Sequence, residues 1–278
     1  MVNDDSIAIC GNDGEGDGKK TKWIRGLKLE KKVNFVCIQE TKATDLNNLP
    51  IRQLWGNSEV RFEGVEAQGR SGGILSLWNP TVFRFENSVK NPNFLLISGS
   101  LVGGQGIVNI VNVYAPQDLD RKRSLWQTFL GLMANGSGMW IFVGDFNEVR
   151  YPEERKLSRF NARGAEYFNE FIAEGNLQEY SMGGSKFTFS YGKGKNFSKL
   201  DRVLVCNDFF ERWPAATVTA MPRLWSDHSP IILKVSVADF GSVPFRFFSS
   251  WLKREDLVSE SGAFLLVIVM IHCLLIWV

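Results

Sequence analysis

Short apolar runs, separated by turn-forming residues, recur along most of this chain. Runs of this length bounded by Gly, Pro, Asn or Ser predict β-strands, and their close spacing between residues 82 and 114 is typical of an antiparallel meander. The expected strands are 6–10, 33–38, 60–66, 72–78, 82–89, 94–102, 107–114, 141–143, 186–191, 198–205, 217–221 and 231–235.

Apolar residues at helical spacing lie between several of these strands. Trp23, Ile24 and Leu27 share one face of such a segment. The expected helices are 21–32, 46–55, 121–133, 164–174 and 208–213, and the glycine-rich stretch 11–20 is interpreted as a flexible loop. Each half of the chain runs from a helix into several strands. This order predicts an α+β fold, a four-layer α/β/β/α sandwich of two packed, mainly antiparallel sheets with outer helices.

Composition adds little to this picture. A chain of 278 residues can bury one large core or two small ones. A formal net charge of +2 does not by itself indicate a nucleic-acid partner. The 4 cysteines are scattered without a CxxC pair, so we expect neither a zinc site nor a disulfide framework. We expect the protein to reside in a reducing compartment.

The two ends differ in character. The first residues are polar and acidic, unlike a secretory signal, so we expect a nuclear or cytoplasmic protein. We expect a catalytic domain over 1–237, a linker over 238–262 and an apolar tail over 263–278. A membrane-spanning helix needs about 20 apolar residues. We therefore interpret the tail as a truncation scar in preference to a membrane anchor. Membrane association through the tail stays open as the alternative.

Polar residues of one kind follow the ends of several expected strands. Asp145 and Asn147 stand two residues apart after the apolar run 141–143, so in an extended segment their side chains point the same way. The whole set is Glu40, Tyr114, Asp145, Asn147, Asp201, Asp227 and His228. Each has an ordinary alternative, such as a turn former, a packing tyrosine or a helix or turn cap. Together they predict a rim of carboxylates, which would repel one another unless a divalent cation lay among them. Oxygen ligands favour Mg²⁺ or Mn²⁺ over zinc.

Basic residues gather in two further segments. The polar loop 150–163 and the turn 192–195 are either solvated surface or one side of a nucleic-acid groove. The candidate contacts there, with one on the adjoining strand, are Arg155, Lys156, Arg159, Lys193, Lys195 and Lys199.

Four short motifs occur in a fixed order: Gln39-Glu40-Thr41, Gly144-Asp145-Phe146-Asn147, Leu200-Asp201-Arg202 and Ser226-Asp227-His228-Ser229-Pro230. In this order and at these separations they resemble the endonuclease/exonuclease/phosphatase superfamily, which has a DNase-I-like fold. Segments 70–73, 112–117 and 197–205 are similar, more narrowly, to the abasic-type endonuclease domain of plant LINE-type retrotransposon polyproteins.

This resemblance implies a role for each matching position. Glu40 would bind the metal ion, and Asp227 would complete the carboxylates on that side. Asp145 would orient or deprotonate the attacking water, and Asn147 would hold that water or the phosphate. The remaining implied roles are a phosphate contact for Tyr114, donation to a phosphate oxygen by His228, orientation of that ring by Asp201, and contact with nucleic acid by Ser71. The implied reaction is magnesium-dependent hydrolysis of a phosphodiester in DNA, and no protein partner is expected.

The first expected strand departs from the family pattern. The family has an Asn that helps to hold the metal where this chain has Gly11. Asn12 lies one residue later and could serve after a slip in the glycine loop, or Asp13 could substitute. Otherwise the domain is a catalytically impaired relic of a mobile element that retains nucleic-acid binding. A phosphodiesterase or phosphatase acting on a small or lipid substrate is a further alternative on the same fold.

Overall fold

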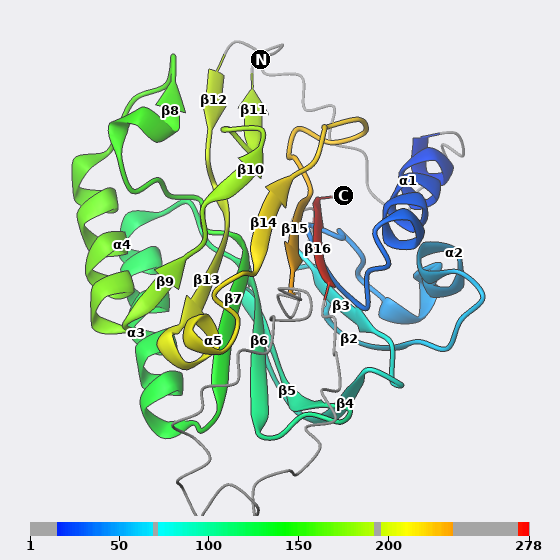
Figure 1. Ribbon diagram of the computed structural model, residues 1–278. Helices are drawn as coiled ribbons and strands as arrows, with labels where there is room; N and C mark the ends of the chain where they lie inside the picture. Colours follow the sequence, from blue (N-terminus) through cyan, green and yellow to red (C-terminus); the bar gives the residue numbers. More distant parts are fainter. Residues whose placement is uncertain (1–15, 69–71, 192–195, 236–271, 278) are drawn as a thin grey trace, which may run out of the picture.

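A computed structural model of the chain describes residues 16–68, 72–191, 196–235 and 272–277. Two β-sheets lie face to face at its centre (Figure 1). One has seven strands in the order β10-β14-β15-β16-β1-β3-β2, and the other has six in the order β4-β5-β6-β7-β13-β9. Both sheets mix antiparallel pairs with a few parallel ones.

The strands of the seven-stranded sheet come from both halves of the chain. They are β1 (Phe35–Gln39), β2 (Arg61–Val65), β3 (Ile74–Trp78), β10 (Met182–Gly184), β14 (Thr217–Ala220), β15 (Ile231–Lys234) and β16 (His272–Trp277). β1 pairs antiparallel with β3 and parallel with β16. All five residues of β1 are buried, which explains the apolar run from Phe35 to Ile38 that precedes the buried Gln39.

The six-stranded sheet is built around the expected meander. Its strands are β4 (Phe83–Asn91), β5 (Phe94–Leu101), β6 (Ile107–Tyr114), β7 (Met139–Asp145), β9 (Leu177–Glu179) and β13 (Asp201–Cys206). β7 runs parallel to β6 and antiparallel to β13, and all seven of its residues are buried. A small third sheet joins β8 (Arg155–Lys156), β11 (Phe189–Tyr191) and β12 (Asn196–Ser198).

Apolar side chains fill the space between the two large sheets. The strand alternation places Cys37 of β1, Ile97 of β5 and Ile141 of β7 in this shared core. The outer face of the six-stranded sheet packs against α3 (Leu119–Asn135) and α4 (Ala162–Glu174), mainly through aromatic rings such as Trp126 and Phe171.

The remaining helices cover the other sheet or connect strands. α1 (Gly16–Glu30) and α2 (Ile51–Trp55) pack on the outer face of β1 and β3 (Figure 1). The remaining helical segments are short: the 3-10 helices η1 (Leu46–Asn48) and η2 (Pro152–Glu154), and the α-helix α5 (Asn207–Arg212). The expected four-layer α/β/β/α sandwich is thereby confirmed. None of the described helices is both long enough and apolar enough to cross a membrane.

Several local expectations need correction. Residues 16–20 belong to α1 and are not part of a glycine loop, because the packing of Ile24 and Leu27 carries the helix back into this stretch. The expected strand 198–205 is two strands, β12 and β13, which belong to different sheets. The expected strand 6–10 and the linker 238–262 lie outside the described residues. Within the apolar segment 263–278, residues 272–277 form β16.

Candidate functional site

The end of β7 brings three polar residues together on neighbouring strands. Asp145 is paired with Tyr114 of β6 on one side and with Asp201 of β13 on the other. Gly144 makes this register possible, because it adopts φ +137° and a Cβ there would lie 2.0 Å from the carbonyl oxygen of Val113. The parallel pairing of β6 and β7 therefore requires glycine directly before Asp145.

The chain turns sharply after Asp145. The backbone N–H of Asn147 donates to Asp145 Oδ1 at 2.8 Å, and Asn147 itself adopts a left-handed φ of +48°. Its carboxamide nitrogen donates to the Ala115 carbonyl at 2.7 Å. The Asn147 carbonyl accepts a bond of 2.6 Å from Lys122 Nζ of α3. Asn147 is thus held from three directions, in a conformation that asparagine tolerates better than most residues.

Glu40 approaches from the opposite sheet. It follows β1 directly, also with a left-handed φ (+51°), and its Oε1 accepts a short hydrogen bond from the Tyr114 hydroxyl. Beneath this contact, Gln39 Nε2 donates to Asn112 Oδ1 at 2.5 Å, and both side chains are fully buried. This inner bond joins the two sheets and sets the alignment in which Glu40 meets Tyr114.

A histidine–aspartate pair completes the arrangement. His228 precedes β15, and its Nδ1 lies 2.8 Å from Asp201 Oδ2, with both side chains buried. Thr188 braces the pair, because its hydroxyl oxygen accepts from the N–H of Asp201 at 3.0 Å while its carbonyl accepts from Ser229 at 2.6 Å. The Phe189 ring also contacts the imidazole, with 4.6 Å between ring centroids.

Burial and charge shift the pKa of several of these groups. Burial, aided by the charges of Asp201 and Glu40 against the opposing effect of His228, raises the pKa of Asp145 to about 8. Burial likewise raises the pKa of Glu40. Burial alone would lower the pKa of His228, but the adjacent Asp201 carboxylate outweighs it and the pKa rises. The site thus holds more carboxylates than cations and favours an added positive charge.

A divalent cation would meet oxygen ligands here. Asp145 Oδ2 is buried and has no hydrogen-bond partner among the described residues, and Glu40 lines the same cavity as Asp227. Among the described residues, no three His, Cys, Asp or Glu side chains converge closely enough to enclose a metal ion. Mg²⁺ does not require such a cage, because it commonly takes one or two protein carboxylates and completes its shell with water and phosphate oxygens. The residues present fit that mode of binding.

Two cavities meet at these residues. One of about 590 Å³ extends past Gln68 and Asn93, and one of about 440 Å³ extends past Asp227 and His228. Both are lined by Glu40, Tyr114, Gln117 and Asn147. Asp145 and Asp201 are buried and line neither cavity, so Glu40, Tyr114 and Asn147 form the accessible border of the site where the two cavities adjoin, and together these cavities form a groove that suits an extended substrate.

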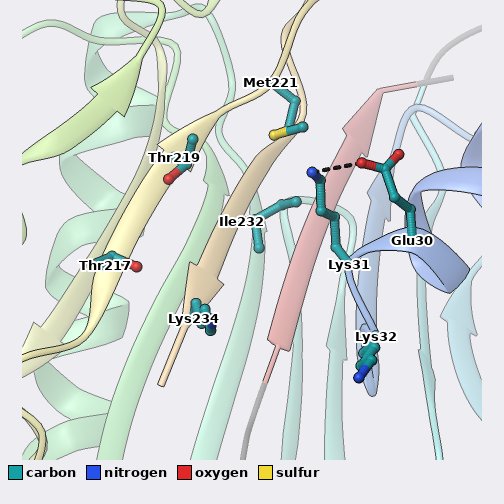
Figure 2. A pocket seen from close by; sticks show the side chains of 8 residues that line it. All are labelled: Glu30, Lys31, Lys32, Thr217, Thr219, Met221, Ile232 and Lys234. Carbon is teal, nitrogen blue, oxygen red and sulfur yellow. Dashed lines mark ion pairs between the residues drawn. The ribbon is translucent and has the colours of Figure 1, made fainter. Parts of the chain in front are cut away.

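A further cavity of about 380 Å³ lies elsewhere, on the outer face of the seven-stranded sheet beside the end of α1 (Figure 2). Side chains of β14 and β15 line one side of it, and Lys31, in an ion pair of 2.7 Å with Glu30, lies on the other. None of the residues expected to act in the site lines this cavity.

The expected basic contacts are only partly gathered. Arg155 lines the cavity that holds His228, whereas Lys156 and Arg159 are exposed on the same loop and line neither site cavity. Lys199 is bound to Glu179 at 2.7 Å, so the structure gives it a structural role instead of an open contact. Asn12, Ser71, Lys193 and Lys195 lie outside the described residues.

Four residues around the site were not singled out from the sequence: Asn112, Lys122, Glu148 and Thr188. Asn112 stands within a quoted motif, yet its partner Gln39 is 73 residues away, and the others carry no local signal. Their importance arises from long-range contacts that spacing along the chain does not reveal.

Comparisons with known proteins agree with this architecture. The model of the endonuclease/exonuclease/phosphatase family matches residues 21–228. An AP endonuclease from Leishmania major has a TM-score of 0.60 at 15% identity, covering 77% of this chain and 81% of that one. A 3′ phosphatase from Neisseria, solved with a product DNA hairpin, has a TM-score of 0.57 at 16% identity, with 77% and 93% covered.

The endonuclease domain of TRAS1, a telomere-specific non-LTR retrotransposon, has a TM-score of 0.56 at 18% identity and covers 79% of this chain and 94% of that one. At these identities the solved structures show a shared fold. No curated protein sequence matches the chain.

Proposed function

This chain belongs to the endonuclease/exonuclease/phosphatase family, and from that premise we propose that it is a metal-dependent DNA endonuclease that hydrolyses one phosphodiester bond. The observation that carries the proposal is the meeting of Tyr114, Asp145 and Asp201 on three adjacent strands, opposite Glu40. A buried hydrophobic sandwich has no structural need for these carboxylates at one end.

The residues divide the work by their chemistry. Asp145 orients the attacking water or takes its proton, acting in the charged form that burial disfavours and a bound cation would favour, and the Asn147 carboxamide holds that water or a phosphate oxygen. His228, whose pKa the Asp201 carboxylate raises, donates to a phosphate or leaving oxygen. Tyr114 keeps its proton, because burial and Glu40 raise its pKa; its hydroxyl donates to Glu40 in the structure and would serve as a neutral donor to the scissile phosphate once Glu40 turns to a cation.

Glu40 and Asp227 are the residues that would hold Mg²⁺ or Mn²⁺ in this proposal. A bound cation would supply positive charge to a phosphate as negative charge builds on its oxygens. The unpartnered, buried oxygen of Asp145 supports a cation nearby.

The finer assignment is to DNA nicking in a LINE-type retrotransposon of plant origin. Its support is the motif match in segments 112–117 and 197–205, together with the shared fold of a retrotransposon endonuclease domain. Hydrolysis would leave a 3′-hydroxyl able to prime reverse transcription.

A plasmid-nicking assay tests the proposal. We expect supercoiled DNA to be nicked with Mg²⁺ and not with EDTA, and the Asp145→Ala and His228→Ala variants to lose at least about a hundredfold in rate. Glu86→Ala, which removes an exposed carboxylate on β4, is the matched control and should nick like the wild type. A folded wild-type protein that cleaves nothing with any divalent cation would refute the enzymatic proposal.

An impaired relic is the second candidate, because Gly11 stands where the family has a metal-holding Asn. Gly11→Asn distinguishes the two. A large gain in nicking by this variant over a nearly inactive wild type would favour the relic, whereas equal and substantial rates would favour an intact enzyme.

A further inference from the structure

Arg155 faces the candidate site from a separate part of the fold. It lies on β8, which pairs with β12 through the register of Arg155 with Ser198. Its side chain lines the same cavity of about 440 Å³ as Glu40 and His228. Arg155 therefore borders the groove, and it belongs to a different sheet from the residues proposed to act on the scissile bond.

Arg155 shares a carboxylate with a second cation. Glu148, almost fully buried, forms an ion pair of 2.8 Å with Lys122, which is also buried. Arg155 Nη2 lies 4.0 Å from the second oxygen of the same Glu148, and that oxygen also accepts the Val149 N–H at 3.2 Å. Lys122 and Arg155 thus share one carboxylate, and Lys122 has the closer contact with it, so the Arg155 guanidinium has only a distant ion pair with Glu148.

The guanidinium also has an unmet hydrogen bond. Its Nε is buried and has no partner among the described residues. Partial desolvation of a cation is unfavourable unless an anion or several acceptors compensate it. Nε is closed to solvent, but the Arg155 side chain as a whole is 21% exposed, and a guanidinium presents a planar fork of donors that matches a phosphate.

A buried ion-pair network holds the backbone beside Arg155. Glu154 accepts from both terminal nitrogens of Arg202, a fully buried residue of β13, and its carbonyl accepts from Lys199 at 2.9 Å. Arg202 also donates to Glu179 at 2.7 Å. This bracing limits the freedom of the loop before any ligand arrives, which lowers the entropic cost of binding at Arg155.

We propose that Arg155 binds a non-scissile phosphate of the DNA strand, one that flanks the bond placed at Asp145 and His228. The inference rests on the proposed function and narrows it, because only a polynucleotide carries a second phosphate at a fixed separation. Arg155 then selects polynucleotides over isolated phosphodiesters and phosphomonoesters. Lys156 and Arg159, exposed on the same loop, do not share this contact.

The test uses the full chain and a DNA oligonucleotide in EDTA, with binding followed by fluorescence anisotropy. Arg155→Ala should weaken binding roughly fivefold to tenfold and reduce the slope of log affinity against log salt by about 1. Arg155→Lys should keep the salt slope while recovering only part of the affinity, because lysine lacks the fork. Arg84→Ala, at an exposed site on edge strand β4, is the control and should match the wild type. Circular dichroism and thermal melting establish that the variants are folded.

Single methylphosphonate replacements then locate the contact. Neutralising one particular non-scissile phosphate should weaken wild-type binding and have no further effect on Arg155→Ala. Failure of the wild type to bind DNA, equal affinities of the two proteins, or the same phosphate profile for both would overturn the inference. A wild type that shows this coupling but nicks no DNA would refute the proposed hydrolysis and leave the Arg155 contact standing.

Discussion

At the scale of single residues, Asp145 is placed where its charge opposes folding. Its pKa is raised from 3.8 to about 8, chiefly by burial, so the folded protein keeps the proton at pH values where the unfolded chain has released it. The contribution of Asp145 to the free energy of unfolding is therefore fully present below about pH 4. It is lost progressively as the pH rises toward 8. An acidic site that requires a cation would show this pattern when the cation is absent.

We therefore expect Asp145→Asn to stabilise the metal-free protein. The gain in melting temperature should grow as the pH rises from 3.8 to about 8 and level off above it, because only the wild type develops the buried charge. Thermal melts in EDTA across this range measure it. Glu86→Gln, at an exposed carboxylate, should show no such growth, and added Mg²⁺ should stabilise the wild type more than Asp145→Asn. A melting difference that shrinks with rising pH would contradict the assignment.

The His228–Asp201 pair makes a second prediction at this scale. Because the Asp201 carboxylate raises the pKa of His228 against the effect of burial, Asp201→Asn should lower that pKa, and the imidazole should lose its proton at a lower pH. The chain has only 2 histidines, so ring signals in an NMR titration can be assigned with His228→Gln. Asp227→Asn should cause a smaller fall, since the Asp227 charge contributes less than Asp201. Equal falls in both variants would contradict a specific Asp201 effect.

The sequence predicted which residue types form the site better than it predicted what holds them. Tyr114 and Asp145 end strands and Glu40 follows one, so their position is visible in the hydrophobic pattern, whereas Asp201 begins β13 within an expected strand. Lys122 is a different case, because it looks like one charge among several on α3 and acquires its role only where α3 meets the left-handed turn at Asn147.

At the scale of elements, the hydrophobic pattern was accurate for long strands and weak for short ones. The expected strands 94–102 and 107–114 agree with β5 and β6 to within one residue. β9 and β10 were not expected, since three residues are too few to show a period. The expected strand 198–205 is divided into β12 and β13 because the two parts form backbone hydrogen bonds with different sheets. These pairings depend on the tertiary structure and are not visible in the local sequence.

The buried bond between Gln39 of β1 and Asn112 of β6 aligns the two sheets, and its contribution can be measured. Asn112→Leu should destabilise the fold by about 1–3 kcal/mol, because Gln39 Nε2 then loses its acceptor in a dry interior. The double variant Gln39→Leu/Asn112→Leu should cost less than the sum of the two single changes. Denaturant unfolding of the four proteins gives this coupling energy. Strict additivity would show that the bond does not couple the sheets.

At the scale of the whole molecule, the site depends on both sheets at once. Glu40 and His228 adjoin β1 and β15 of one sheet, whereas Tyr114, Asp145 and Asp201 belong to the other. Between β1 and β15 lies β16, which pairs with both, so among the described residues these two strands are connected only through residues 272–277. The separation of Glu40 from His228 therefore depends on what occupies that position in the sheet.

Removing residues 272–278 tests this dependence. The deletion exposes the edges of β1 and β15, so we expect a lower melting temperature, concentration-dependent association and loss of nicking. A deletion of the same length within 238–262 is the control. An unchanged melting temperature and nicking rate after the deletion would show that neither the fold nor the site depends on β16.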